Sequence, residues 1–146
     1  MEIFPICLKL QKQRCLIVGG GHIAYRKANL LVKAGAIVDV IAPEIIPELR
    51  QLVEQSAGQY IQTAFSETIL ATTYRLVIAA TDQPDVNKTV FEQCEARNIL
   101  VNSVDDIPHC RFMVPAIIDR SPLVVSVASN GASPVLSRQL RTQIET

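Results

Sequence analysis

The chain has 146 residues, 49% of them apolar, and its 14 basic and 14 acidic side chains cancel to a formal net charge of zero. A domain of this size removes roughly 70% of its unfolded-chain surface from water, so we expect a substantial core. The neutral balance disfavours nucleic acid as the main partner, because phosphate binding needs a clustered basic surface. No apolar run approaches the ~20 residues of a membrane span, and no basic leader precedes the first apolar residues, so we expect neither a membrane contact nor a signal peptide.

The four cysteines form no CxxC pair, which favours a reduced, cytoplasmic setting. Cys7 and Cys15 lie in apolar strand-like runs, and Cys94 lies on the apolar stripe of a predicted helix, so we interpret these three as core residues. Since the chain has 2 histidines, we expect no dedicated His/Cys metal site.

The first two thirds of the chain alternate strand patterns with helix patterns. Helical spacing covers 22–34, with Gly35 as the stop, and then 45–57. A third helix carries Pro84 in its first turn, Asp82 as its expected N-cap and an apolar stripe that ends at Cys94. A helical turn is expected at 66–71. Strands are expected at 6–10 (a short strand or hairpin), 14–18, 37–41, 60–63, 76–80 and 99–101. This order predicts an α/β fold with a Rossmann-type doubly wound parallel sheet.

The rhythm changes after Asp106, where four prolines punctuate the remainder. A strand at 123–128 and a helix at 133–144 are expected there. We therefore divide the chain into a nucleotide-binding domain at 1–110 and a small α+β dimerisation segment at 111–146. The segment is too short to hold its own core, and a homodimer is the simplest way to cover it. Its helix reaches the end of the sequence without a stop signal, so we expect a further helical part. The segment also has a small surplus of arginine that could hold an anionic substrate: Arg111, Arg120, Arg138 and Arg141 against Asp119 and Glu145.

A glycine-rich turn links the strand at 14–18 to the helix at 22–34. Gly19, Gly21 and Ala24 there match the pattern GxGxxA. Gly19 permits the tight turn, Gly21 lets a pyrophosphate approach the backbone, and Ala24 allows close packing of helix on strand. The helix N-terminus adds free N–H groups and a partial positive charge. The motif predicts dinucleotide binding, and a purely structural glycine turn is the alternative.

Further cofactor contacts are expected where neighbouring strands end. Glu44 lies just past the strand at 37–41 and is our candidate for the adenosine ribose, whereas Asp39 lies mid-strand, at the wrong depth. No arginine follows at once, which favours NAD over NADP. Ala80 and Thr81 end the strand at 76–80, where small residues let a cofactor lie against the sheet.

Two carboxylates follow the strand at 99–101. Asp105 or Asp106 could face a substrate beside the nicotinamide, because ligands of such sheets bind outside the carboxyl ends of the strands. A carboxylate there can accept a proton as a hydride leaves; a solvated turn before Pro108 is the alternative. We expect His22 to present its backbone to the cofactor and His109 to be a surface loop residue.

Several segments together resemble the N-terminal module of siroheme synthase, the precorrin-2 dehydrogenase and sirohydrochlorin ferrochelatase family. The resemblance runs through nearly the whole chain in the right order, and its most specific blocks are 118–122 and 131–134. His22 departs from the acidic residue that the family often has after the glycines, and Asn130 and Ala132 depart from its Gly-Gly-Thr-Ser-Pro pattern. The matching segments are 4–6, 15–21, Ala24, 26–28, 30–31, 79–82, 102–105, 115–123 and 129–136.

This resemblance implies an enzyme in which NAD takes a hydride from precorrin-2, a tetrapyrrole, to give sirohydrochlorin in siroheme biosynthesis. It leaves open ferrous iron insertion as a second activity, with iron as a substrate. It implies Asp105 as the catalytic residue and a homodimer as the assembly. It implies cofactor contacts at His22, Ile23, Pro43 and Glu44, which add to Gly19, Gly21, Ala80 and Thr81 from the motif and the strand ends. The implied substrate contacts are Asn102, Arg120, Ser129, Gly131 and Ser133.

Two other functions remain open. An NAD-binding regulatory module would bind the cofactor without turnover. A dehydrogenase for a small substrate would leave the segment 129–134 unexplained.

Overall fold

The computed structural model describes residues 1–71 and 73–146, which divide into two compact units. One unit is Leu8–Arg111, and the other combines Met1–Cys7 with Phe112–Thr146. The first seven residues thus group with the C-terminal segment, although the sequence analysis placed them in a domain of 1–110. Within the described ranges, none of the helices is long and apolar enough to cross a membrane.

The larger unit is built on a five-stranded parallel sheet with the strand order β3-β2-β1-β4-β5. Its central strands are continuous apolar runs because both faces of the sheet are covered. The predicted doubly wound α/β fold is confirmed. The strands are β1 (Arg14–Val18), β2 (Ile37–Ile41), β3 (Tyr60–Ile61), β4 (Leu76–Ala79) and β5 (Leu100–Ser103).

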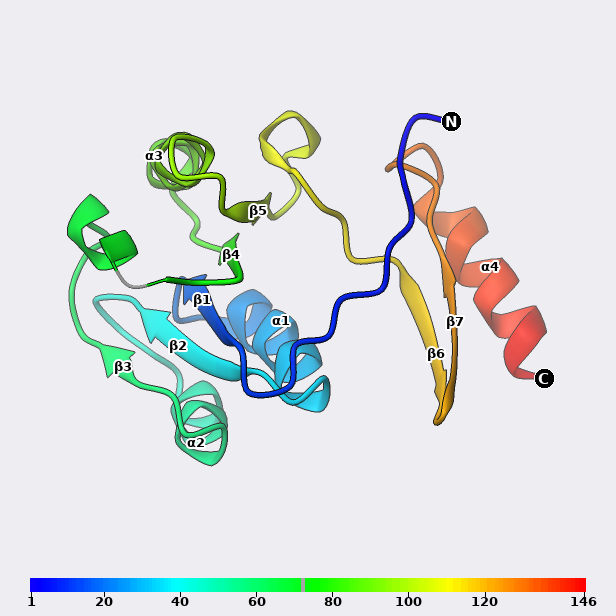
Figure 1. The fold of residues 1–146 in the computed structure, drawn as a ribbon, viewed down its shortest axis with the longest axis horizontal. Coiled ribbons are helices and arrows are strands. Elements are labelled where there is room, and N and C mark those ends of the chain that lie inside the picture. The colour runs from blue at the N-terminus through cyan, green and yellow to red at the C-terminus, as the bar shows by residue number, and fades with distance from the viewer. Residues whose placement is uncertain (72) are drawn as a thin grey trace. The chain divides into compact units, whose positions relative to one another are not determined.

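Helices cover both faces of this sheet, with α1 (His22–Lys33) and α2 (Pro47–Gln55) on one face and α3 (Pro84–Glu95) on the other (Figure 1). The face under α3 packs Leu16 and Val18 of β1 against Val90 and Cys94 of the helix. The predicted stripe on α3 is therefore confirmed. Two short 3-10 helices, η1 (Glu67–Ala71) and η2 (Ile107–His109), complete the unit.

Two helix starts differ from the sequence prediction. Helix α2 begins at Pro47 rather than at residue 45, because a proline disfavours helical backbone in the residue before it, and Ile46 is extended at φ −71° and ψ 147°. The expectation that Asp82 caps α3 is wrong: Gln83 occupies the N-cap, and its side chain makes no capping hydrogen bond.

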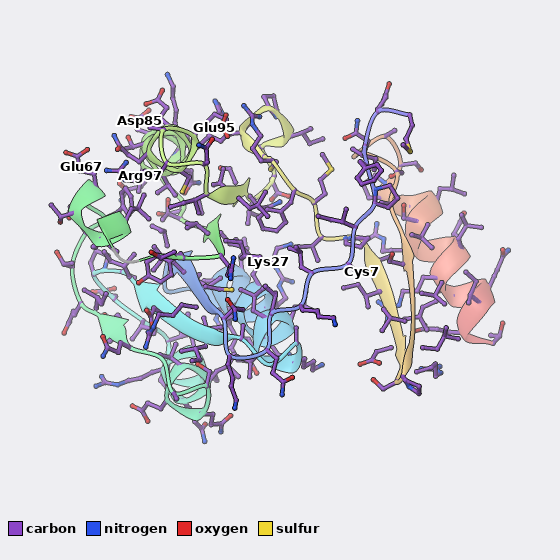
Figure 2. The ribbon with its side chains drawn as sticks, in the orientation of Figure 1. Cys7, Lys27, Glu67, Asp85, Glu95 and Arg97 are labelled. Atoms are coloured by element: carbon purple, nitrogen blue, oxygen red, sulfur yellow. The ribbon has the colours of Figure 1, made fainter. Side chains whose placement is uncertain are left out.

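Several strand boundaries differ, and β4 ends at Ala79 rather than at residue 80. The prediction of a strand at 6–10 is wrong, and Cys7, expected in the core, is exposed (Figure 2). Strand β3 stops at Ile61 rather than at residue 63. Strand β5 continues past its predicted end through Asn102 and Ser103, whose side chains are buried.

A buried aspartate of β2 links this strand to β1 and to the segments that precede β3 and β4. The Asp39 carboxylate, 3% exposed, accepts hydrogen bonds from the Arg14 guanidinium at 2.7 Å, the Tyr74 hydroxyl at 3.0 Å and the Gln59 backbone N–H at 2.9 Å. Burial, followed by the nearby Asp39 charge, raises the pKa of Tyr74 well above its usual range, so the tyrosine stays a donor. Asp39 is therefore structural, which agrees with its exclusion as a ribose ligand.

The smaller unit contains an antiparallel hairpin of β6 (Ala116–Arg120) and β7 (Leu123–Val127), with α4 (Pro134–Glu145) packed on both strands. Ser133 caps α4 by accepting the Leu136 N–H at 3.2 Å. Strand β7 and helix α4 match the predictions to within about one residue. Strand β6 was missed, because prolines flank it and its alternation is weak.

Candidate cofactor site

A cavity of about 690 Å³ opens at the carboxyl ends of β1 and β4 in the larger unit. These strands are neighbours, and the helices that follow them cover opposite faces of the sheet. Such a switch point is where open α/β sheets bind ligands. The volume lies within the range of small-molecule and cofactor sites.

The three glycines of the loop after β1 have two kinds of role. Gly19 has φ +130°, and a Cβ there would collide with the Ala80 backbone carbonyl. A Cβ on Gly20 would collide with the Glu44 backbone carbonyl, a constraint that the sequence analysis missed. A Cβ on Gly21 would meet no atom within 4 Å, so this glycine faces open space in the cavity. Two glycines shape the protein, and the third leaves room for a ligand.

The N-terminus of α1 lies in the same cavity. Gly21 is the N-cap, no side chain caps the helix, and its first turn carries no acidic residue. The first N–H bonded within the helix is that of Tyr25, which donates to the Gly21 carbonyl at 3.0 Å. The N–H groups of residues 22–24 are thus left for an outside acceptor, and the helix dipole makes this end positive. These features fit the pyrophosphate of a dinucleotide.

The remaining walls come from the loops after β2, β3, β4 and β5. Phe65, half-buried, and Val86 of α3 add apolar surface. All eight residues that we expected to contact the cofactor line the cavity: Gly19, Gly21, His22, Ile23, Pro43, Glu44, Ala80 and Thr81.

The structure separates the two candidate carboxylates after β5. Asp105 lines the cavity, is exposed, and has φ +60°, a left-handed backbone conformation that is uncommon outside glycine. No side chain within 1–71 and 73–146 is hydrogen-bonded to its carboxylate. Asp106 instead contacts His109 Nδ1 at 2.6 Å. The His109 ring packs edge-on against Phe91 at 4.9 Å, so the expectation of a plain surface loop residue is wrong for His109.

The predicted substrate residues are divided between the two units. Asn102 is a buried residue of β5 that bridges to Cys110, and it does not line the cavity. The other four belong to the smaller unit. There Ser129 Oγ accepts the Ser133 N–H at 3.2 Å, and Gly131 follows at φ +74°. Arg120 is exposed at the end of β6.

The cysteines of the larger unit are not activated nucleophiles. Burial raises the pKa of the Cys15 thiol to about 11 and that of the Cys94 thiol to about 12. Burial also raises the pKa of the Cys110 thiol, which donates to the Ser103 carbonyl at 3.2 Å. All three stay protonated near neutral pH, so no thiolate chemistry is assigned to them.

The parallel sheet, the glycine loop and the free helix N-terminus define a Rossmann-type dinucleotide-binding protein. The chain belongs to the family described as "Putative NAD(P)-binding", whose model matches residues 6–116. The predicted nicotinamide dinucleotide cofactor is confirmed at the level of this family.

Named relatives share the whole length of the chain. Siroheme synthase of Acinetobacter baylyi is 77% identical over 100% of this chain and 32% of its own length. Siroheme synthase of Chromobacterium violaceum is 51% identical over 100% of this chain and 31% of its own length. The chain thus spans about a third of these relatives.

A solved structure described as SirC, precorrin-2 dehydrogenase, is similar in fold. It has a TM-score of 0.81 and 25% identity, and the match covers 98% of this chain and 70% of that chain. The predicted resemblance to the siroheme synthase module is confirmed by these matches.

Proposed function

We propose that this chain is an NAD-dependent dehydrogenase that converts precorrin-2 to sirohydrochlorin. The observation that carries the proposal is the open space at Gly21 beside the uncapped N-terminus of α1. The identity to siroheme synthases and the fold match to a precorrin-2 dehydrogenase support the choice of substrate.

The cofactor would be held by backbone and by small side chains. The free N–H groups at the start of α1 would bind the pyrophosphate, and Gly21 would admit it. Glu44, exposed at the end of β2, would accept a ribose hydroxyl. When bound, NAD supplies the hydride acceptor for the reaction.

Asp105 is our proposed general base. Dehydrogenation removes a hydride and a proton from the substrate, and the carboxylate of Asp105 would take the proton. Two observations support this role over Asp106, whose carboxylate contacts His109: Asp105 lines the cavity, and none of the described side chains is hydrogen-bonded to its carboxylate. The left-handed backbone at Asp105 is the kind of local strain that functional sites retain.

The test is to incubate the chain with precorrin-2 and NAD and to follow NADH and the sirohydrochlorin spectrum. We expect Asp105→Asn to lower turnover at least ~100-fold, the low end for loss of general-base help, while NAD binding persists. The matched control is Asp106→Asn, one residue away, which should retain most of the turnover. Equal losses in both variants would remove Asp105 from its role.

We also propose a homodimer formed through the smaller unit. Its α4 helix exposes Leu136, Leu140 and Ile144 at a spacing of four residues, which places them on one face. Leu123 and Val124 of β7 are exposed as well. An apolar surface of this kind favours association, and sedimentation of the chain as a monomer at micromolar concentration would contradict it. The proposed setting is the cytoplasm, which agrees with four free cysteines.

The second candidate function is a regulatory module that binds NAD without chemistry. It is favoured by the cavity and the glycine loop, which account for cofactor binding whether or not turnover follows. In that case NAD would bind, no NADH would form, and Asp105→Asn would be silent. Ferrous iron insertion remains a prediction; no observation on the described residues favours it.

A further inference from the structure

We infer that Asn87 is a positioning residue for the dinucleotide, acting through the backbone of Thr81. This inference rests on the proposed cofactor binding. Asn87 lies on the first turn of α3, is 9% exposed, and does not line the cavity. It occupies the buried stripe of α3 with Val90 and Cys94, where an apolar residue would be expected. A buried amide has to be hydrogen-bonded, so its partners indicate its role.

Asn87 makes all of its described side-chain hydrogen bonds to one residue. Its Oδ1 accepts the Thr81 backbone N–H at 3.2 Å and the Thr81 hydroxyl at 2.6 Å. Its Nδ2 donates to the Thr81 carbonyl at 3.0 Å. A single side chain thus fixes both peptide groups of Thr81, beyond the end of β4, where strand pairing no longer does so.

The segment held in this way forms a wall of the cofactor cavity. Thr81 and the residues next to it, Ala80 and Asp82, line the cavity. The same segment also supports the glycine loop, because a Cβ on Gly19 would collide with the Ala80 carbonyl and would approach the Thr81 nitrogen at 3.3 Å. The position of Thr81 therefore sets the separation between the loop after β1 and the loop after β4.

Loss of these bonds is expected to release the loop rather than to unfold the sheet. Val90 and Cys94 still anchor α3 in the core, and the Ala80 N–H still donates to the Val18 carbonyl at 2.8 Å. The free Thr81 segment would then populate conformations that do not bind the dinucleotide. If the competent fraction falls to about a tenth, the apparent Kd rises about tenfold.

The experiment compares Asn87→Leu with Val90→Ala, one helical turn further on the same buried stripe, by calorimetric titration of the full chain with NAD. Circular dichroism establishes that each variant is folded at the temperature of the titration. We expect Asn87→Leu to weaken NAD binding about tenfold. Val90→Ala removes core packing alone and should leave the Kd close to the wild-type value. Asn87→Asp keeps both acceptor bonds and should fall between wild type and Asn87→Leu.

In turnover assays, the KM for NAD should rise in Asn87→Leu while kcat changes little, because Asn87 does not reach the reacting groups. If Asn87→Leu and Val90→Ala shift the Kd equally, Asn87 serves stability alone and the inference is overturned. If the wild-type chain itself fails to bind NAD, the proposed function falls, a result distinct from equal shifts in the two variants.

Discussion

Replacing Gly21 by alanine should weaken cofactor binding and leave the fold intact. Gly21 has φ −95°, which an L-residue adopts without strain, and an added Cβ meets no atom within 4 Å. Alanine leaves the unfolded chain fewer conformations than glycine does, and this stabilises the variant by about 0.4–1 kcal/mol. Alanine is a poorer N-cap than glycine by about the same amount, so the two effects nearly cancel. We therefore expect a Tm within a few degrees of wild type.

The added methyl group weakens binding because it occupies the space that the pyrophosphate would enter. Forcing a methyl group into a filled contact costs about 1–3 kcal/mol. At about 1.4 kcal/mol per tenfold change, this corresponds to a Kd for NAD roughly 5- to 150-fold higher. Titration calorimetry measures the Kd, and thermal denaturation measures the fold.

Gly20→Ala is the matched control, one residue away. Its Cβ would collide with the Glu44 backbone carbonyl, so this variant should lose stability in the absence of any ligand. A Gly21→Ala protein that is folded and binds NAD as tightly as wild type would refute the assignment of this space to the pyrophosphate.

Three further predictions concern the larger unit. Asp39→Asn should lower the free energy of unfolding, measured by urea denaturation, by about 3 kcal/mol. This is the low end for breaking a buried ion pair, chosen because the Arg14 side chain is 36% exposed. A loss under about 1 kcal/mol would contradict the role of Asp39. A thiol reagent near neutral pH should modify exposed Cys7 quickly, and should modify buried Cys15 and Cys94 only as fast as the chain unfolds. Rapid labelling of Cys94 would contradict its placement in the core. The contribution of Cys15 and Cys94 to the unfolding free energy should be constant below pH 9 and decline from pH 9 to about 12. The reason is that unfolded thiols lose protons near their ordinary pKa of 9.0, while the folded thiols keep theirs up to about 11 and 12. Cys94→Ala should flatten the decline measured in this pH range, and an unchanged slope would contradict the prediction.

The sequence predicted best where local chemistry and tertiary packing favour the same structure. Strands β1 and β2 matched residue for residue, because each is predominantly apolar and bounded by turn residues, with Arg14 and Asp39 as the charged exceptions. The stop of α1 at Gly35 also matched, and Gly35 has φ +81°. The glycine loop was located correctly, since a strand, three glycines and a helix occur in immediate succession.

The misses arose where tertiary contacts decide. The run at 6–10 is apolar, but no described strand pairs with it, so it stays irregular. Strand β5 extends through Asn102 and Ser103 because β4 offers pairing partners at Ile78 and Ala79, which no local pattern of polar residues reveals. Strand β6 forms because β7 pairs with it.

Some residues of the candidate site could be predicted from the sequence, and others depend on tertiary contacts. The residues that follow strand ends could be listed from the sequence, because the carboxyl ends of parallel strands share one edge. Position after the strand could not distinguish Asp105 from Asp106, and only the family resemblance indicated Asp105. The bond between Asp106 and His109 was not visible in the sequence. Asn87 and Gly20 went unnoticed, although a polar residue on the apolar stripe of α3 was a usable signal.

A crystal structure of the chain with NAD tests the central claim most directly. We predict that the diphosphate lies at the N-terminus of α1, within hydrogen-bond reach of the His22 and Ile23 N–H groups and against the Cα of Gly21. A nucleotide bound elsewhere, with this end of the helix untouched, would contradict the account.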